Sequence, residues 1–147
     1  MIFDDRLEFV DNTALTTATG TNLQGDVIDI TSSRDWGMGE PLYLVIQFTE
    51  AVTSGGSATV QFKLLSDAAA AIATDGTATQ HADTGALAKT VCTLGHRIIL
   101  PIGVGVTFER FVGITLTTAT ATLTAGKIDA FLTKDPVGWT AYADATN

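Results

Sequence analysis

The chain has 147 residues and a mass of 15.3 kDa, which suits one domain, residues 1–147, with a buried core. Charged residues make up 16% and hydrophobic residues 46%, which excludes an intrinsically disordered chain. The net charge of −8, without any basic cluster, argues against binding of nucleic acid. The longest apolar run, Leu42 to Ile46, is far shorter than a membrane span of ~18 residues, and no secretory leader is evident, so we expect a soluble product of the cytoplasm that does not bind membranes.

The predicted elements are almost entirely strands. Threonine (25 residues) and alanine (20) are dispersed along the chain, and helical periodicity is nearly absent. Threonine favours strands because its branched Cβ packs well on a pleated surface. The predicted strands, in chain order, are 3–10, 27–30, 42–49, 58–66, an irregular strand within 84–94, 97–100, 107–116 and 123–133.

Turn signals separate these strands. A turn is predicted at 23–26 and again at Gly103-Val104-Gly105, whereas 67–74 is expected to form a loop or a single turn. Strands 42–49 and 58–66 each have alternating apolar residues, and they flank Ser54-Gly55-Gly56. This arrangement predicts a hairpin across a glycine turn.

The threonine-rich stretch from Thr115 to Lys127 is predicted to contain the ends of two strands. Val112, Ile114 and Leu116 share one face of the first strand, and the parity of the apolar positions changes between Ala125 and Ile128. Glycine is the residue that a bulge favours, so we predict two antiparallel strands with a bulge at Gly126.

About eight strands in one small acidic domain predict an all-β fold, a two-sheet antiparallel jelly roll or related β-sandwich. The last residues, 134–147, include Pro136, Trp139 and Tyr142 but show no periodicity. We expect them to form an extended C-terminal arm.

Residue patterns for catalysis or metal binding are weak. His81 and His96 are fifteen residues apart, which is not a metal-ligand spacing. A metal site formed by both histidines and Asp83 is therefore disfavoured, and we interpret the two as ordinary surface or loop histidines. Asp26 and Asp29 are three apart on a predicted strand and should face opposite sides. We therefore predict no catalytic residues, no metal and no cofactor.

A single cysteine, Cys92, excludes an internal disulfide and is expected to be a small buried hydrophobic residue. Aromatic residues in loops and arms often contact partners, although Trp36 and Trp139 could equally be buried within their own subunit. The predicted partner-interface residues are Phe3, Trp36, Trp139 and Tyr142.

Several stretches resemble one family. They are MIFDDRLEFVDNTALT at the start, QFKLLSD at 61–67, LPIG at 100–103, ERFVGI at 109–114 and TLTAGKIDAFLTKD at 122–135. Over most of its length the chain is similar to the jelly-roll cement, or decoration, proteins of tailed-phage capsids, the type seen in short-tailed Bordetella phages.

The resemblance implies a structural virion protein on the outer surface of the capsid, synthesised in the host cytoplasm. Its implied partners are the phage major capsid protein and a second copy of itself, with a homodimer favoured over a homotrimer. The alternative is a carbohydrate- or receptor-binding jelly-roll module of a phage particle, for which Trp36 with Arg34 and Asp35 is the local candidate. An enzyme on a β-barrel is the less favoured third class.

Overall fold

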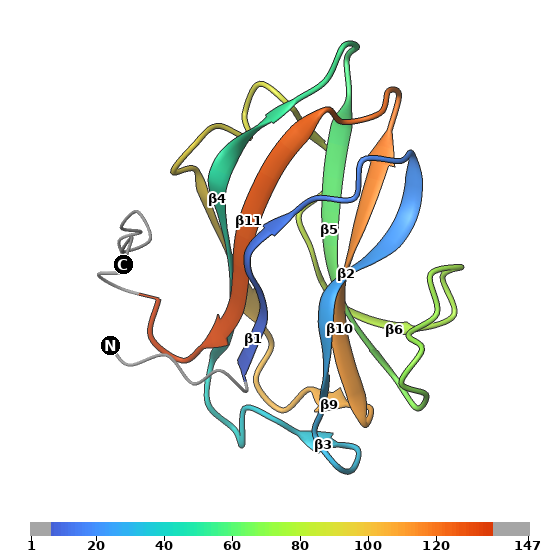
Figure 1. Ribbon diagram of the computed structural model, residues 1–147. Helices are drawn as coiled ribbons and strands as arrows, with labels where there is room; N and C mark the ends of the chain where they lie inside the picture. Colours follow the sequence, from blue (N-terminus) through green and yellow to red (C-terminus); the bar gives the residue numbers. More distant parts are fainter. Residues whose placement is uncertain (1–6, 137–147) are drawn as a thin grey trace, which may run out of the picture.

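The computed structural model describes residues 7–136 as a sandwich of two antiparallel sheets (Figure 1). The first sheet has the strand order β1-β11-β4-β8. Its strands are β1 (Glu8–Ala14), β11 (Ala125–Thr133), β4 (Leu42–Thr53) and β8 (Arg97–Ile102).

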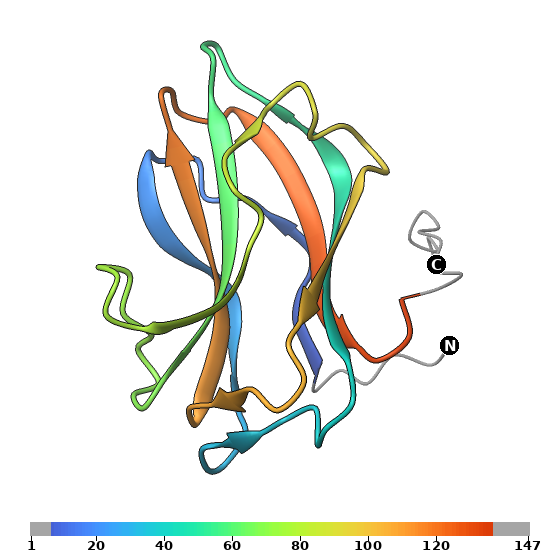
Figure 2. The same ribbon diagram turned by 180° about the vertical axis from the view of Figure 1, so that it is seen from behind.

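The second sheet has the order β2-β10-β5-β6, and a short strand β7 also pairs with β5. Its strands are β2 (Gly20–Asp29), β10 (Phe111–Ala119), β5 (Thr59–Asp67), β6 (Thr79–Asp83) and β7 (Leu87–Ala88). A third, two-stranded sheet of β3 (Arg34–Asp35) and β9 (Thr107–Phe108) lies at one end of the sandwich, as both views show (Figure 2).

The winding of the strands is that of a jelly roll, which confirms the predicted fold class. Strands β1 and β2, β4 and β5, and β10 and β11 are successive along the chain, yet the members of each pair belong to opposite sheets. They occupy corresponding places in the two sheets, so the chain passes back and forth across the core. In the described part, no helix is present that could cross a membrane.

The core lies between the inner faces of the two sheets. Leu44, Ile46 and Phe48 of β4 belong to the same buried cluster as Phe62 and Leu64 of β5, and all five are fully buried. The rings of Phe48 and Phe62 meet edge to face, with centroids 6.1 Å apart. Burying a side chain of this size contributes about 1.5–3 kcal/mol, so this alternating pattern is the main reason why the strands pack.

The predicted hairpin between β4 and β5 is wrong. Strand β4 pairs with β11 and β8, whereas β5 pairs with β10, β6 and β7. Gly55 and Gly56 therefore connect one sheet to the other. Alternation of apolar residues shows which face of a strand is buried, but it does not identify the neighbouring strand.

The prediction for the threonine-rich stretch is half confirmed. The strand pairing is wrong, because β10 and β11 lie in different sheets. The bulge is confirmed, because the pairing of β11 with β4 shifts between Ala125 and Lys127 and again before Ile128. Gly126, between them, is buried and has a φ of +144°. A Cβ there would lie 3.2 Å from side-chain atoms of Leu15 and Val52.

The predicted turn at 23–26 is also wrong, because β2 continues through it. In its pairing with β10, Val112 lies opposite Ile28 but Ile114 lies opposite Gln24, so the register shifts. Gly25, which follows Gln24, has a φ of +78°. Gly25 therefore forms a bulge within a strand. The first strand is shifted as well: β1 starts at Glu8 and ends at Ala14, while residues 1–6 lie outside the described part.

Smaller differences concern the second half of the chain. Within 84–94 only the two residues of β7 form a strand, and 107–116 is divided into β9 and β10 because β9 pairs with β3 in the separate small sheet. Pro101 lies inside β8, which is an edge strand. Proline has no backbone N–H, and it is tolerated in an edge strand because the open side of the strand forms no hydrogen bonds with a neighbour. The predicted loop at 67–74 and the turn at Gly103–Gly105 are confirmed.

Candidate functional site

Trp36 follows β3, and its ring packs against the subunit's own core. It contacts Phe108 edge to face, with centroids 5.9 Å apart and an interplanar angle of 84°. The residue is half-buried and packs against the buried cluster. Phe3, Trp139 and Tyr142, the other predicted interface residues, lie outside the described part, so a partner role for this group stays a prediction.

The expectation that His81 is an ordinary surface or loop residue is wrong, because its side chain contacts other residues of the subunit. Its ring stacks on Phe108 with centroids 4.1 Å apart, and its Nε2 lies 2.7 Å from the Oγ of Ser66. Burial lowers the pKa of His81, while the nearby charge of Glu109 opposes this shift. His96 instead lies beside the ring of Phe48, with centroids 6.1 Å apart.

Ser66 connects His81 to the segment between β9 and β10. The backbone N–H of Glu109 donates to Ser66 Oγ at 3.0 Å, and the carboxylate of Glu109 accepts from Thr79 Oγ1 at 2.6 Å. Ser66 Oγ therefore accepts from this amide and also forms a hydrogen bond with His81 Nε2, in which the donor depends on the tautomer of the ring.

This serine–histidine pair has the residue types of a hydrolase site, but its geometry suits structural support. Ser66 is 0% exposed, so a substrate carbonyl has no path to its oxygen in this conformation. The pair ties β5 to β6 and to Glu109. The sequence did not reveal it, because Ser66 and His81 are fifteen residues apart and no local motif marks them.

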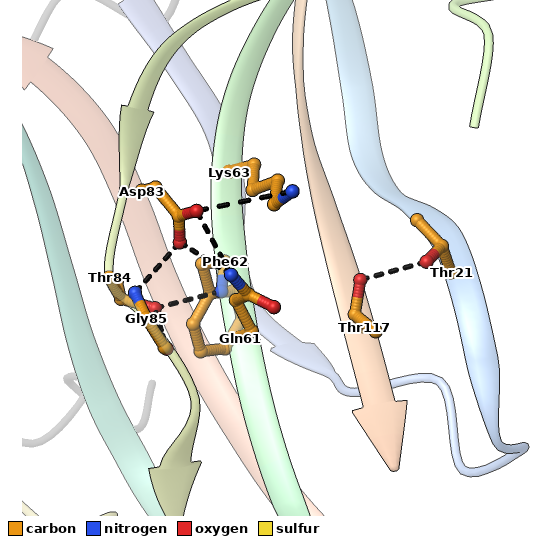
Figure 3. Close-up of polar contacts among 8 residues, drawn as sticks. All are labelled: Thr21, Gln61, Phe62, Lys63, Asp83, Thr84, Gly85 and Thr117. Carbon is orange, nitrogen blue, oxygen red and sulfur yellow. Dashed lines mark hydrogen bonds and ion pairs between the residues drawn. The ribbon is translucent and has the colours of Figure 1, made fainter. Parts of the chain in front are cut away.

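Polar side chains cover part of the outer face of the second sheet (Figure 3). Asp83 accepts two hydrogen bonds from Gln61 Nε2, at 2.8 and 2.9 Å, and one from the N–H of Gly85 at 2.7 Å. Lys63 Nζ lies 3.9 Å from the same carboxylate. Asp83 thus fixes β5 against β6. Among residues 7–136, no three His, Cys, Asp or Glu side chains are grouped so that they could hold a metal ion.

The same face continues across β10 to β2. The hydroxyl groups of Thr21 and Thr117 lie 2.8 Å apart and form a hydrogen bond, which Figure 3 marks with a dashed line. Thr115, two residues earlier, is fully buried, and its Oγ1 has no hydrogen-bond partner within the described structure. Nearby, the loop after β5 packs Ile72 over Gly113, where an added Cβ would lie 2.7 Å from Ile72 Cδ1. These positions of the face are therefore occupied by contacts within the subunit.

Cys92 is a small buried residue, as predicted. It is 0% exposed, and burial raises the pKa of its thiol to about 11. At neutral pH the sulfur is a thiol and not a thiolate, so it is a poor nucleophile and a poor metal ligand.

Large apolar side chains are exposed at both ends of the sandwich. Met38 (84% exposed) and Val104 (60%) lie in turns near the small sheet of β3 and β9. Leu94 (70%) and Val91 (46%) lie in the β7–β8 connection. Between these two residues in the chain, the backbone carbonyl of Cys92 accepts a hydrogen bond from the N–H of Val52. Val52 lies near the C-terminal end of β4, so this connection is at the other end of the sandwich. Single exposed apolar residues are common, but those in loops can contact a protein partner.

A groove runs between β1 and β2, the edge strands of the two sheets. It has a volume of about 390 Å³ and is lined by two short segments, one from each strand. Asp26 and Asp29 both line it, although their spacing predicted opposite orientations. The groove follows the strand edge, so residues of both parities reach it.

These features define an antiparallel jelly-roll domain with a groove at its strand edges, polar networks that join its strands, and exposed apolar residues at both ends. The chain belongs to the Bbp16 family, whose model matches residues 9–132, from β1 to β11. The name of this family suggests a Bordetella phage protein. No curated protein matches the chain.

Proposed function

We propose that the protein is a cement, or decoration, protein of a tailed-phage capsid. In this proposal it binds the outer surface of the head and clamps neighbouring major capsid protein subunits together. The supporting observation is the family match, which covers the jelly roll from β1 to β11 and agrees with the resemblance of the quoted sequence stretches to such proteins.

The physical basis of this function would be repeated adhesion and not chemistry. Each contact with the shell can be weak, because a homodimer presents every contact twice and linked contacts raise avidity by ~10²–10⁴. The net charge of −8 suits basic patches on the capsid surface. The proposal requires no cofactor, no metal, no nucleic acid and no membrane.

Capsids that lack the protein provide the test. Purified protein should co-sediment with such capsids and raise the temperature at which they break open, and its mass in solution should be that of a dimer. Attachment should weaken as salt is raised, because exposed charge pairs are screened. A protein that stays monomeric and ignores these capsids would overturn the proposal, and retention through high-salt washes would remove its electrostatic part.

The predicted C-terminal arm, which from residue 137 onward lies outside the described part, offers a second test of the same function. Deleting Pro136 to Asn147 should reduce attachment to capsids more than it lowers the free energy of unfolding. Matched measurements of co-sedimentation and urea unfolding on the same preparation would show this. Equal losses in both measurements would mean that these residues serve the fold of the subunit.

A further inference from the structure

Strands β1 and β2 leave two sheet edges open on the same side of the sandwich. Within residues 7–136, β1 pairs only with β11, and β2 pairs only with β10. Figure 1 shows the two strands beside each other, and they are in contact without forming a common ladder. An open edge has backbone N–H and C=O groups on which a further strand can form hydrogen bonds.

The two strands approach most closely at the bulge of β2. A Cβ on Gly25 would lie 2.0 Å from Val10 Cγ1 and 2.3 Å from the carbonyl oxygen of Phe9. Next to this contact lies the groove of about 390 Å³, between residues 8–11 of β1 and residues 26–29 of β2. At a rise of ~3.3 Å per residue, four residues of edge offer about 13 Å, enough for three or four residues of an added strand.

The groove is acidic. Glu8, Asp11, Asp26 and Asp29 line it, and no basic residue does. Asp29 is paired with Arg110, whose Nη2 lies 2.8 Å from the carboxylate, and this hydrogen bond is the main reason why the pKa of Asp29 is lowered. Asp11 and Asp26 are exposed and have no ion pair among the described residues.

We propose that this groove, which we call the edge groove, binds an extended Lys- or Arg-containing segment of the capsid subunit. The segment adds as a strand along the open edge of β2 at Asp26–Asp29, and its basic side chains lie beside Asp11 and Asp26. The open edge supplies backbone hydrogen bonds, and the two unpaired carboxylates select for positive charge. This inference rests on the proposed function, because it specifies the chemistry of the capsid contact.

The test combines a charge variant with a matched control. Asp11→Asn with Asp26→Asn keeps the shape of both side chains but removes two charges from the groove. Glu50→Gln with Asp75→Asn removes the same charge from positions that lie outside the groove and outside the C-terminal arm. Each exposed ion pair is weak, so we expect the groove variant to bind capsids about two- to thirtyfold less tightly, with a smaller dependence on salt. The control should bind within about twofold of the unchanged protein.

A model peptide tests the groove without the capsid. The probe is acetyl-(Val-Lys)₃-amide, and acetyl-(Val-Glu)₃-amide is its control. In NMR titrations, the lysine peptide should shift the backbone amide signals of residues 26–29, whereas the glutamate peptide should not. The Asp11→Asn, Asp26→Asn variant should lose most of this response. Hydrogen exchange at residues 26–29 should also slow when the protein is bound to capsids.

The outcomes separate the two proposals. If the protein binds capsids but the groove variant binds equally well and residues 26–29 exchange as before, the edge-groove inference is wrong and the cement function stands. If the protein does not bind capsids but the lysine peptide binds at residues 26–29, the groove is a site for basic strands, and the proposed cement function is wrong. If the groove variant changes only the mass of the oligomer, the groove is an interface between copies, which would also overturn the inference.

Discussion

Replacing Gly25 by alanine should destabilise the protein by two separable effects. The first is conformational, because a φ of +78° is left-handed and costs an alanine about 1–2 kcal/mol. The second is steric, because the new Cβ would lie 2.0 Å from Val10 Cγ1 and 2.3 Å from the carbonyl oxygen of Phe9. The carbonyl group of Phe9 belongs to the backbone and cannot rotate away as a side chain can, so β1 and β2 must separate. This separation should lower the free energy of unfolding by about a further 1–3 kcal/mol.

Gly105→Ala is the matched control. Its φ of +76° is nearly the same, but no atom lies within 4 Å of the added Cβ, so only the conformational cost applies. Urea unfolding should show a loss of about 1–2 kcal/mol for Gly105→Ala and about 2–5 kcal/mol for Gly25→Ala. The melting temperatures should fall by about 2–4 °C per kcal/mol. Equal losses for the two variants would refute the close approach of β1 and β2.

Three further predictions concern residues in or beside the core. Phe108→Ala should lower the free energy of unfolding by about 3–5 kcal/mol, because the ring contacts both Trp36 and His81. The control Val104→Ala, at an exposed position, should change it by less than about 0.5 kcal/mol. Similar losses for the two variants in urea unfolding would contradict the packing described. The folded pKa of His81 is below its ordinary value of 6.5, so its contribution is complete above pH 6.5 and is lost as pH falls through the folded pKa. Between pH 7 and pH 5 the free energy of unfolding should therefore fall more steeply for the unchanged protein than for His81→Asn, and parallel curves would argue against a half-buried neutral ring. At pH 8 the Cys92 thiol should react with a disulfide reagent more than about tenfold more slowly in the folded than in the urea-unfolded protein, because its side chain is 0% exposed and burial raises its pKa to about 11. Comparable rates would mean that the thiol is accessible.

The sequence predicted where side chains are buried better than it predicted which strands are neighbours. Alternation located β4 and β5 to within a few residues at most boundaries, because burial of one face is a local property of a strand. The pairing of β4 with β11 joins residues about eighty positions apart, and no local signal encodes it. The bulge at Gly126 was predicted because a change of parity is visible in the sequence.

The errors at the glycines have a common physical cause. A glycine followed by aspartate, as at Gly25, is typical of a turn, but the same positive φ also occurs in a bulge within a continuous strand. Similarly, Gly55 and Gly56 are compatible with a tight hairpin or with a crossing between sheets. The edge groove was not predicted, because it depends on how β1 and β2 approach each other in space.

The pairing of β1 with β11 also has a consequence for the order of events in folding. Glu8 of β1 lies opposite Phe131 of β11, so their ladder cannot form until more than 120 intervening residues have been synthesised. Topologies dominated by such distant pairings fold in milliseconds to seconds, slowly for a domain of this size. Until the two ends meet, the unpaired strands of a new chain are exposed to one another and to neighbouring chains. The first sheet of a newly made subunit therefore stays incomplete until β1 and β11 have paired.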